Sequence, residues 1–345
     1  MARLLVTGGA GFLGSHFVRC WHARHPGDQI TVLDLLTYAG SRERLSDIEK
    51  SGECKFLRGD ICDPVVVKQA MEDCRTLVHF AAETHVDRSI TSAAPFVRTN
   101  MEGTLVLLEQ ARNSDVARFV FISTDEVYGP VLAGMVDEEA PLRPKSPYAA
   151  SKAAADLLVQ AFWHTHGLPA VIVRPTNIFG PWQLPEKFVP VCITHGLEGR
   201  AVPLYGDGLQ RRSWLYVEDL CDALIMVVEE AKDGELYNLA GGTERTNRDV
   251  AQTILRGVGA PASLLQSVTD RPGHDRRYAM DDHKLRAIGW QPRITFEQGL
   301  SSTIAWYREH ESWWRPLTQR LREDTYHWLN RPAGSGVVPS ARAVR

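Results

Sequence analysis

Short apolar runs recur along the first half of the chain and alternate with longer segments that mix apolar and polar residues. Runs of about four to eight residues, bounded by Gly, Pro or Asp, are typical of strands that are covered on both faces. Longer segments with apolar residues three or four positions apart are typical of helices. The runs predict strands at residues 3–8, 30–34, 54–60, 76–81, 118–124 and 170–175.

Amphipathic segments fill the gaps between these strands. They predict helices at residues 14–23, 64–71, 96–112 and 148–166. A regular alternation of strands and helices indicates a parallel sheet, because two parallel strands need a long crossover connection, usually a helix. The fold class expected here is therefore α/β, with a doubly wound parallel sheet.

The rhythm loosens after about residue 180, where Pro, Gly and Trp become frequent. Predicted helices at 219–231 and 246–257 stand among short strands such as 236–240. These shorter elements indicate a second, smaller domain that closes over the first. Because helices and strands are still interspersed, we expect the chain to cross between the two domains after residue 180.

We divide the chain into three parts on this basis. Residues 1–180 form the larger domain, residues 181–317 the smaller one, and residues 318–345 a C-terminal extension. The pattern predicts one last helix within residues 320–329. The final stretch, RPAGSGVVPSARAVR, is typical of a flexible tail because it is rich in Pro, Gly and Ser.

Composition excludes several function classes. A net charge of −3 over 345 residues gives no signal for nucleic acid or an anionic membrane as a partner. No apolar run is long enough to span a bilayer, and the opening MARLLVTGGAG reaches glycine too early for a signal peptide. Six cysteines without C-x-x-C or zinc-ligand spacing predict reduced, packed thiols and no metal site. These features are typical of a cytoplasmic enzyme.

The first predicted strand ends in the glycine-rich stretch TGGAGFLG. Gly9, Gly11 and Gly14 satisfy G-x-G-x-x-G, and Gly8, Gly11 and Gly14 satisfy the related G-x-x-G-x-x-G. Such glycines permit a tight turn, close approach to a pyrophosphate and close packing of strand and helix. The N-terminus of the following helix offers N–H groups and a positive dipole to phosphates. The motif predicts a dinucleotide site, with a glycine turn made only for packing as the alternative.

Two acidic residues end the next strands. Asp34 ends the second strand, where a carboxylate binds the ribose 2′-OH and repels a 2′-phosphate, which favours NAD over NADP. Asp60 ends the third strand and is placed to reach the adenine edge. A solvated surface carboxylate is the alternative interpretation at both positions.

The apolar run Phe119–Ile122 leads at once into Ser123, Thr124, Asp125 and Glu126. Carboxylates are rarely placed near a core unless they are paired, hydrogen-bonded or functional. Adjacent residues of a regular strand point to opposite faces, so Asp125 and Glu126 converge only if the strand ends before or between them. Either they form an acid and a base, or one of them merely caps a turn.

Tyr148 and Lys152 form Y-x-x-x-K at the start of a predicted helix, where residues four apart share one face. A nearby ammonium, together with a nicotinamide cation, lowers the pKa of a phenol. Tyr148 is then able to act as a base on a substrate hydroxyl. An ordinary surface pair is the alternative, and the dinucleotide motif argues against it.

Together the motifs resemble those of the extended short-chain dehydrogenase/reductases, and more narrowly of the dTDP-glucose 4,6-dehydratase family. The resemblance spans about residues 3–317 and rests on TGGAGFLG, HFAAETHVDRSI, STDEVYG, SPYAASKAAAD, WQLPEKF, YGDG and DRPGHDRRYAMD. It implies a Rossmann domain, a smaller C-terminal α/β domain that binds a nucleotide-sugar, a tightly bound and recycled NAD, and a homodimer. The implied product, a 4-keto-6-deoxy sugar nucleotide, belongs to deoxysugar biosynthesis.

The resemblance also implies roles for individual residues. Tyr148 takes the C4 hydroxyl proton while hydride leaves C4 for NAD. Glu126 removes the C5 proton, and Asp125 protonates the departing C6 hydroxyl. Hydride then returns to C6, and Glu126 reprotonates C5. The implied catalytic set is Thr124, Asp125, Glu126, Tyr148 and Lys152.

Binding residues follow in the same way. Two arginines suit bidentate binding of a diphosphate, and Tyr205 suits stacking on a base. The implied cofactor contacts are Gly8, Gly11, Phe12, Leu13, Gly14, Asp34, Asp60, Ile61, Ala81, Thr99, Tyr148 and Lys152. The implied substrate contacts are His85, Thr124, Asn177, Glu186, Lys187, Tyr205, Arg212, Arg271 and Tyr278.

Some positions depart from the family pattern. The chain has TNIFGP where the family usually has SNNYGP, Ser213 in place of Asp, Leu220 in place of His, and Thr84 in place of Ser. Several lie near the expected substrate pocket, so they leave the nucleotide and the sugar open. Two other functions also stay open. One is a 4-epimerase or decarboxylase of the same superfamily, whose members generally lack the Asp-Glu pair, and the other is a non-catalytic NAD-binding regulatory protein.

Overall fold

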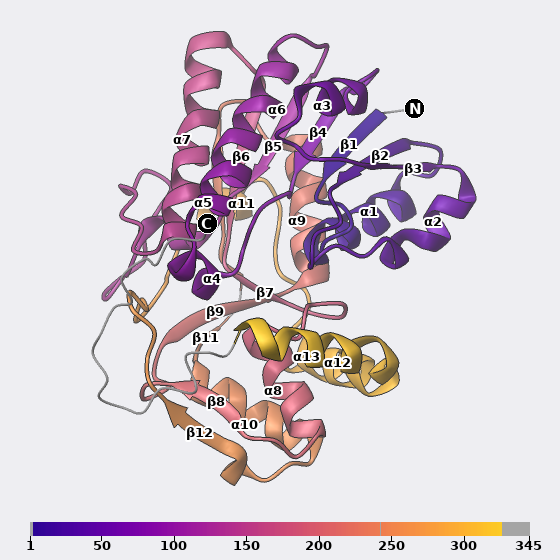
Figure 1. Ribbon diagram of the computed structural model, residues 1–345. Helices are drawn as coiled ribbons and strands as arrows, with labels where there is room; N and C mark the ends of the chain where they lie inside the picture. The colour runs from indigo at the N-terminus through magenta and orange to yellow at the C-terminus, as the bar shows by residue number, and fades with distance from the viewer. Residues whose placement is uncertain (1–2, 242, 326–345) are drawn as a thin grey trace, which may run out of the picture.

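A seven-stranded parallel sheet forms the larger part of the molecule (Figure 1). The computed structural model describes residues 3–241 and 243–325. All neighbouring strands of this sheet run parallel, in the order β10-β6-β5-β4-β1-β2-β3. The expected doubly wound sheet is thereby confirmed. Its strands are β1 (Arg3–Thr7), β2 (Gln29–Asp34), β3 (Cys54–Arg58), β4 (Thr76–His79), β5 (Arg118–Ile122), β6 (Ala170–Pro175) and β10 (Leu236–Leu239).

Helices cover both faces of the sheet, and the strands are apolar on both faces for this reason. On β5, Val120 and Ile122 pack into one core with α1 and α9, while Phe119 and Phe121 pack into the other with α3, α6 and α7. The helices are α1 (Phe12–Arg24), α2 (Ser46–Ser51), α3 (Pro64–Ala70), α6 (Gly103–Arg112), α7 (Pro147–His166) and α9 (Val217–Glu230).

The predicted helix at 96–112 is helical throughout, but a π-helix interrupts its α-helical part. It consists of α5 (Ala94–Phe96), a π-helix (Val97–Glu102) and α6. Inside the π-helix, the buried Asn100 side chain accepts from Glu83 N at 2.9 Å, and its amide nitrogen donates to Glu83 O at 3.0 Å and to Ser151 Oγ at 2.9 Å. The wider turn therefore ties the loop after β4 to α7, and such π turns are often found at functional sites.

A smaller unit lies below the sheet in Figure 1 and has its own core. In a three-stranded sheet, β9 (Arg211–Tyr216) pairs parallel with β7 (Asn177–Phe179) and antiparallel with β11 (Glu244–Thr246). Beside it, β8 (Val202–Tyr205) pairs with β12 (Leu265–Val268). The helices that pack into this core are α8 (Phe188–Leu197), α10 (Asn247–Val258), α12 (Phe296–Glu309) and α13 (Glu311–Thr325).

The chain returns to the large sheet after residue 180, because α9 covers one face and β10 adds the seventh strand. We therefore propose to keep 1–180 and 181–317 as the two domains, with this segment as the crossing. Of the predicted extension, α13 reaches Thr325, and residues 326–345 lie outside the described part of the chain.

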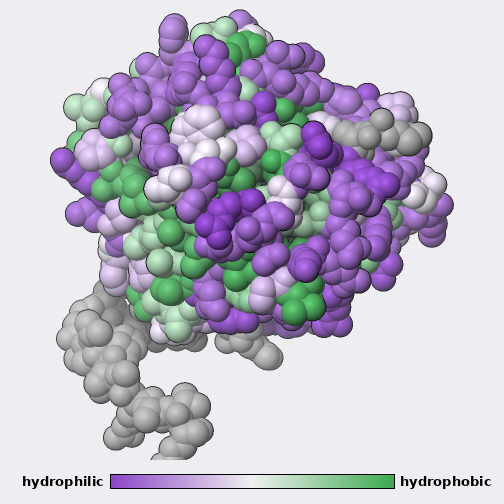
Figure 2. Space-filling view, turned by 90° about the horizontal axis from the view of Figure 1, so that it is seen from above, coloured by the Kyte–Doolittle hydropathy of each residue, from purple (hydrophilic) through white to green (hydrophobic). Residues whose placement is uncertain are grey.

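Two further observations concern the surface and the thiols. All six cysteines are free, four of them buried, as expected from their spacing. Among the described residues, no helix combines the length and apolar character that crossing a bilayer requires. The face seen in Figure 2 is mostly hydrophilic, with hydrophobic side chains gathered in separate patches.

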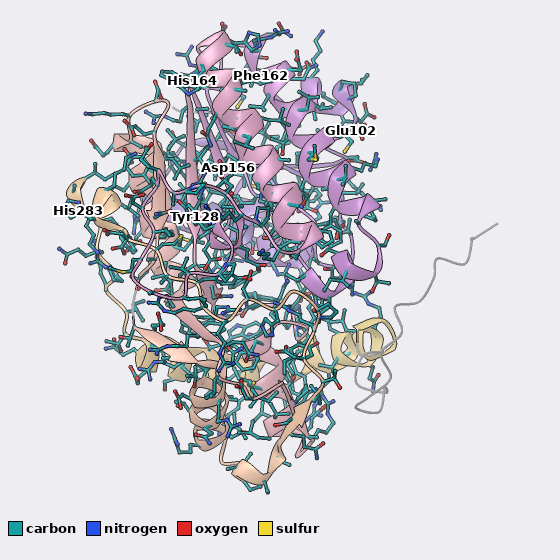
Figure 3. The ribbon with its side chains drawn as sticks, turned by 90° about the vertical axis from the view of Figure 1, so that its left-hand side faces the viewer. Glu102, Tyr128, Asp156, Phe162, His164 and His283 are labelled. Carbon is teal, nitrogen blue, oxygen red and sulfur yellow. The ribbon has the colours of Figure 1, made fainter. Side chains whose placement is uncertain are left out.

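A buried ion pair fixes α7 to the large sheet. Asp156 of α7 accepts two hydrogen bonds from Arg174 of β6, at 2.9 and 2.8 Å, and both side chains are at most 2% exposed. Arg174 also donates to the Tyr128 hydroxyl at 2.6 Å, and Tyr128 donates to Asn238 of β10 at 2.7 Å. Figure 3 shows Asp156 and Tyr128 on neighbouring elements. The network joins α7, β6, β10 and the segment after β5.

We predict that Asp156→Ala lowers the free energy of unfolding by about 3–5 kcal/mol, because it leaves the Arg174 charge buried and unpaired. The matched control is Glu109→Ala, which removes an exposed pair with Arg112 and is expected to cost at most about 1 kcal/mol. Urea unfolding followed by circular dichroism measures both values. Equal losses for the two variants would contradict the prediction.

Candidate active site

The glycine-rich loop between β1 and α1 is packed so closely that larger residues do not fit. A Cβ on Gly8, whose φ is +70°, would lie 2.5 Å from Ala81 N. A Cβ on Gly14 would lie 2.4 Å from Gly8 O. The helix begins at Phe12, and Gly11 caps it without a side-chain hydrogen bond, so its first turn faces the loop with backbone groups. The structure thus brings Gly8, Gly14 and Ala81 together.

Asp34 at the end of β2 lies against this loop. Its two carboxylate oxygens accept from Ala10 N at 3.0 Å and Leu36 N at 2.8 Å. Burial raises the pKa of this carboxyl, and the two backbone donors oppose the shift. The close glycine turn and the carboxylate beside it fit a dinucleotide, with the phosphates at the start of α1 and a ribose at Asp34.

Asp60, Ile61 and Thr99 lie on the next segments along the same edge. The Asp60 carboxylate pairs with Arg98 of the π-helix at 2.8 Å and accepts from Cys62 N at 2.9 Å. Ile61 is buried, and a Cβ on Gly103 would lie 2.5 Å from its Cδ1. Sequence reasoning missed Arg98, and its position next to the predicted Thr99 was the available signal.

The turn after β5 allows the two carboxylates to converge. The strand ends at Ile122, Thr124 is extended, and a 3₁₀ turn runs from Asp125 to Tyr128. The Thr124 hydroxyl accepts from Glu126 N at 3.3 Å and so caps this turn. The strand therefore ends before both carboxylates, which is the condition that their convergence requires.

Burial dominates the electrostatics of this pair. Asp125 is 4% exposed, and burial together with the charge of Glu126 raises its pKa to about 7. Its carboxyl accepts from Thr124 Oγ1 and Thr176 Oγ1, both at 3.3 Å. Burial also raises the pKa of Glu126, against the charges of Arg271 and Arg212. Near neutral pH, Asp125 is thus poised to give up or take a proton.

Tyr148 and Lys152 are buried on the first two turns of α7, so neither is an ordinary surface residue. Lys152 Nζ donates to Ile122 O at 2.6 Å and lies 4.2 Å from the centre of the Phe121 ring. Burial lowers the pKa of this ammonium to about 7.

The pKa of Tyr148 differs from the expectation. Burial and the charge of Glu126 raise it, and a hydrogen bond with the Thr124 side chain opposes the shift. The protein groups around the phenol therefore do not lower its pKa, because burial outweighs the Thr124 hydrogen bond.

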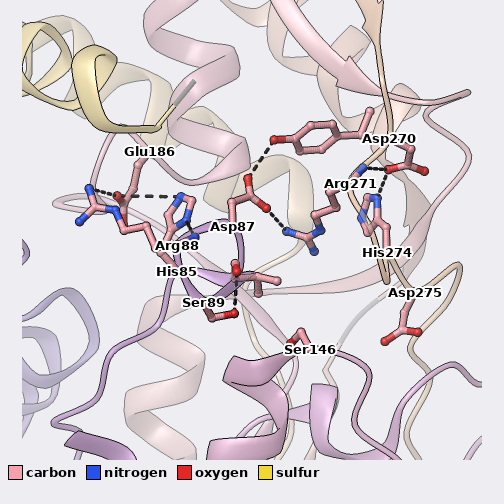
Figure 4. A network of polar contacts seen from close by, with 12 residues as sticks. His85, Asp87, Arg88, Ser89, Ser146, Glu186, Asp270, Arg271, His274 and Asp275 are labelled. Atoms are coloured by element: carbon pink, nitrogen blue, oxygen red, sulfur yellow. Dashed lines mark hydrogen bonds and ion pairs between the residues drawn. The ribbon is translucent and has the colours of Figure 1, made fainter. Parts of the chain in front are cut away.

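Two polar networks join residues that were predicted as substrate contacts to their neighbours (Figure 4). In the first, Asp87 of α4 (Val86–Thr91) accepts from Tyr205 Oη at 2.9 Å and pairs with Arg271 at 3.1 Å. Arg271 and Asp87 are both largely buried. Tyr205 and Arg271, predicted as separate substrate contacts, thus share one carboxylate that sequence reasoning did not assign.

The second network surrounds Glu186, whose side chain is 1% exposed. Its carboxylate accepts from Tyr38 Oη at 3.1 Å and lies 3.4 Å from Arg88 Nη2 and 4.0 Å from both His85 Nε2 and Lys187 Nζ. Burial and the charge of Lys187 lower the pKa of His85 to about 4. Arg88 and Asp87 both stand in the THVDRS motif, which was the available signal for them.

The remaining predicted contacts gather around Arg212. Its guanidinium donates to Asp275 O at 2.8 Å and lies 4.1 Å from the centre of the Tyr278 ring. Tyr278 in turn donates to the Asp275 carboxylate at 2.9 Å. Asn177 Oδ1 is buried without a hydrogen-bond partner, which suits a polar ligand group.

Comparisons with known proteins agree with this geometry. A family model described as GDP-mannose 4,6 dehydratase matches residues 5–303. The chain is 51% identical to a dTDP-glucose 4,6-dehydratase of Streptomyces niveus over 91% of this chain and 95% of that protein. It is 42% identical to a dTDP-glucose 4,6-dehydratase of Escherichia coli over 94% of this chain and 97% of that protein.

Solved structures give the same result. The crystal structure of DesIV, a dTDP-glucose 4,6-dehydratase from Streptomyces venezuelae with NAD and TYD bound, matches with a TM-score of 0.89 at 46% identity, over 91% of this chain and 99% of that one. A UDP-glucose 4-epimerase from Thermus thermophilus in complex with NAD matches with a TM-score of 0.83 at 33% identity, over 89% of this chain and 99% of that one. The chain therefore belongs to the extended short-chain dehydrogenase/reductases, in the family described as GDP-mannose 4,6 dehydratase, and the resemblance to the dTDP-glucose 4,6-dehydratases is confirmed.

Proposed function

We propose that this protein is an NAD-dependent dTDP-glucose 4,6-dehydratase, which converts the nucleotide-sugar to its 4-keto-6-deoxy form with loss of water. The observation that carries the proposal is the adjacent carboxylate pair Asp125–Glu126 beside Tyr148, in which Asp125 is buried and has its pKa raised to about 7. An oxidation alone needs no such pair. Elimination of water needs a base at one carbon and an acid at the neighbouring oxygen.

The catalytic roles follow from this arrangement. NAD, when bound, supplies the acceptor for the C4 hydride and returns that hydride to C6. Tyr148 takes the C4 hydroxyl proton, and Lys152 and Thr124 hold the groups around it. Because the surrounding protein raises the pKa of Tyr148, the positive nicotinamide is the group that favours its ionised form.

Elimination is assigned to the two carboxylates. Glu126 removes the C5 proton, which the 4-ketone makes acidic, and later returns a proton to C5. Asp125 protonates the C6 hydroxyl, which then leaves as water. Burial gives Asp125 a pKa of about 7, so a large fraction of the carboxyl carries the proton that this role needs at neutral pH.

The charged networks hold the substrate. Arg212 and Arg271 bind the diphosphate, since a guanidinium fork matches two phosphate oxygens. Tyr205 contacts the base, and Tyr278 and His85 line the same pocket. Asn177, Glu186 and Lys187 contact the sugar and its neighbouring phosphate. The Asn177-Ile178-Phe179 departure from the family pattern lies beside this pocket, so the thymine nucleotide is assigned from the named relatives.

We also propose that the enzyme is a cytoplasmic homodimer. Large apolar side chains stand exposed on the outer faces of the adjacent helices α6 and α7, at Leu105 and Leu157. We infer that a second copy covers these side chains and the exposed Val97, which fits the expected packing of the Ala-rich helix α7 against a symmetry mate.

The first test is the mass of the product. We expect that the protein with dTDP-glucose and NAD releases a product lighter by one water, which mass spectrometry detects directly. An isomer of unchanged mass would indicate a 4-epimerase. No turnover with any nucleoside-diphosphate glucose would favour a non-catalytic protein.

Glu126→Gln separates oxidation from elimination. The amide keeps the size of the side chain but does not accept the C5 proton, so NADH should form while release of water slows about 10²–10⁴-fold. Nicotinamide absorbance and product mass measure the two steps in one experiment. In D₂O the unmodified protein should place one deuterium at C5. Normal water release by Glu126→Gln would show that another group is the base.

The raised pKa of Asp125 predicts a pH dependence. The acid role needs the protonated carboxyl, so kcat should fall as the pH rises through about 7. Asp125→Asn should lower kcat about 10²–10⁴-fold and abolish this alkaline limb. Asp115→Asn, at an exposed carboxyl before β5, is the control and should keep the profile. Persistence of the limb in Asp125→Asn would assign it to another group.

A further inference from the structure

Three successive backbone carbonyls hold the start of the loop that carries Glu186 and Lys187. Pro181 O bonds to His16 Nε2 of α1 at 2.9 Å, and Trp182 O accepts from Arg44 Nη2 at 3.0 Å. The next carbonyl, Gln183 O, accepts from Tyr307 Oη of α12. Two of these three side chains come from the cofactor half of the molecule, and the third comes from the smaller unit.

Arg44 has the widest reach of the three. It lies on the 3₁₀ turn Arg42–Leu45, after β2, and is 1% exposed. Its Nη1 donates to Ala10 O of the glycine-rich loop at 2.6 Å and to Ala39 O at 2.8 Å, while Nη2 donates to Trp182 O. One guanidinium therefore joins the glycine-rich loop, the loop after Asp34, and the loop that carries Glu186 and Lys187.

The backbone at the Trp182 contact is strained. Trp182 has a φ of +64°, a region that bulky residues rarely adopt. Its indole lies among aromatic side chains of α12 and α13, with ring centres 4.9 Å from Trp306 and 5.2 Å from Trp313. The conformation is thus held by the Arg44 hydrogen bond on one side and by aromatic packing on the other.

A direct role in binding a 2′-phosphate does not fit these contacts. An arginine after β2 sometimes binds that group in NADP-dependent proteins. Here both terminal nitrogens of Arg44 are directed to backbone carbonyls, and the Asp34 carboxylate stands at the ribose position. Burial lowers the pKa of Arg44 to about 10, so the group remains a cation at neutral pH.

We infer that Arg44 is a positioning residue that couples binding of the dinucleotide to binding of the nucleotide-sugar. The inference rests on the proposed function, since that function assigns ligands to the two loops. Binding of NAD orders the glycine-rich loop and fixes the position of Ala10 O. Because Arg44 donates to both Ala10 O and Trp182 O, it then fixes the position of Trp182 O as well. Five residues further on, Lys187 and its neighbour Glu186 then stand ready for the substrate. Binding of either ligand therefore strengthens binding of the other.

Titration calorimetry tests the coupling with NAD and dTDP as probes. We expect the unmodified chain to bind NAD about fivefold or more tightly when dTDP is saturating, and Arg44→Met to reduce this ratio to below about twofold. Arg42→Met is the matched control, because Arg42 stands on the same turn but is itself exposed and donates to Glu49 at 2.8 Å. It should keep the full ratio.

A second variant, Arg44→Lys, keeps the test decisive if Arg44→Met does not fold. It keeps the charge but lacks the planar fork that reaches carbonyls of three segments at once, so the ratio should fall here as well. An unchanged ratio in a folded Arg44 variant overturns this inference but not the proposed function. A ratio near one in the unmodified chain has the same meaning, provided that this chain still forms the dehydrated product. A chain that binds no NAD and forms no product overturns the proposed function, and this inference with it.

Discussion

The burial of Asp125 beside Glu126 at the end of β5 is the constraint on which the site depends. A carboxylate out of water loses hydration and is repelled by a second carboxylate beside it, and both effects favour the neutral acid. The two carboxylates stand side by side because β5 ends at Ile122 and a 3₁₀ turn begins at Asp125. The raised pKa of Asp125 is thus a result of where a strand ends.

Neighbouring positive charges partly offset the cost of placing the two carboxylates together. Arg271 and Arg212 lie near enough to moderate the pKa of Glu126, and Arg271 is itself paired with Asp87. Other cations in the pocket also have protein partners: Arg88 faces Glu186, and Lys187 bonds to Thr84 O at 3.1 Å. A pocket organised in this way meets an anionic ligand with its donors already oriented, so less ordering is required on binding.

Much of the fold and of the candidate site could be predicted from the sequence, and the exceptions have physical reasons. Apolar runs identified the six strands of the large sheet before residue 180, because burial on both faces leaves a strong local signal. The π turn at Asn100 left no such signal, since it depends on a hydrogen bond to a loop seventeen residues away. The spacing of Tyr148 and Lys152 did not reveal that burial raises the pKa of Tyr148, nor that Lys152 is held by a carbonyl.

The residues missed at the site share a property. Arg44, Asp87 and Arg98 act through backbone carbonyls or other protein charges, and such partners are defined only when distant segments meet. Residues of the short motifs were named because their pattern is local. Sequence reasoning therefore proposed candidate reacting groups more readily than the groups that hold them.

The ion pair between Asp156 and Arg174 has a consequence for how such proteins diversify. It anchors the helix of Tyr148 and Lys152 to the large sheet. The groups that we propose to react all stand on the span from β5 to α7. Most groups that we propose to select the nucleotide-sugar stand on later segments, but their partners lie before β5: Tyr205 and Arg271 bond to Asp87, and Lys187 bonds to Thr84. Exchanging the later segments to change the specificity would therefore also require new residues in the segment after β4, while the anchored span from β5 to α7 stays intact.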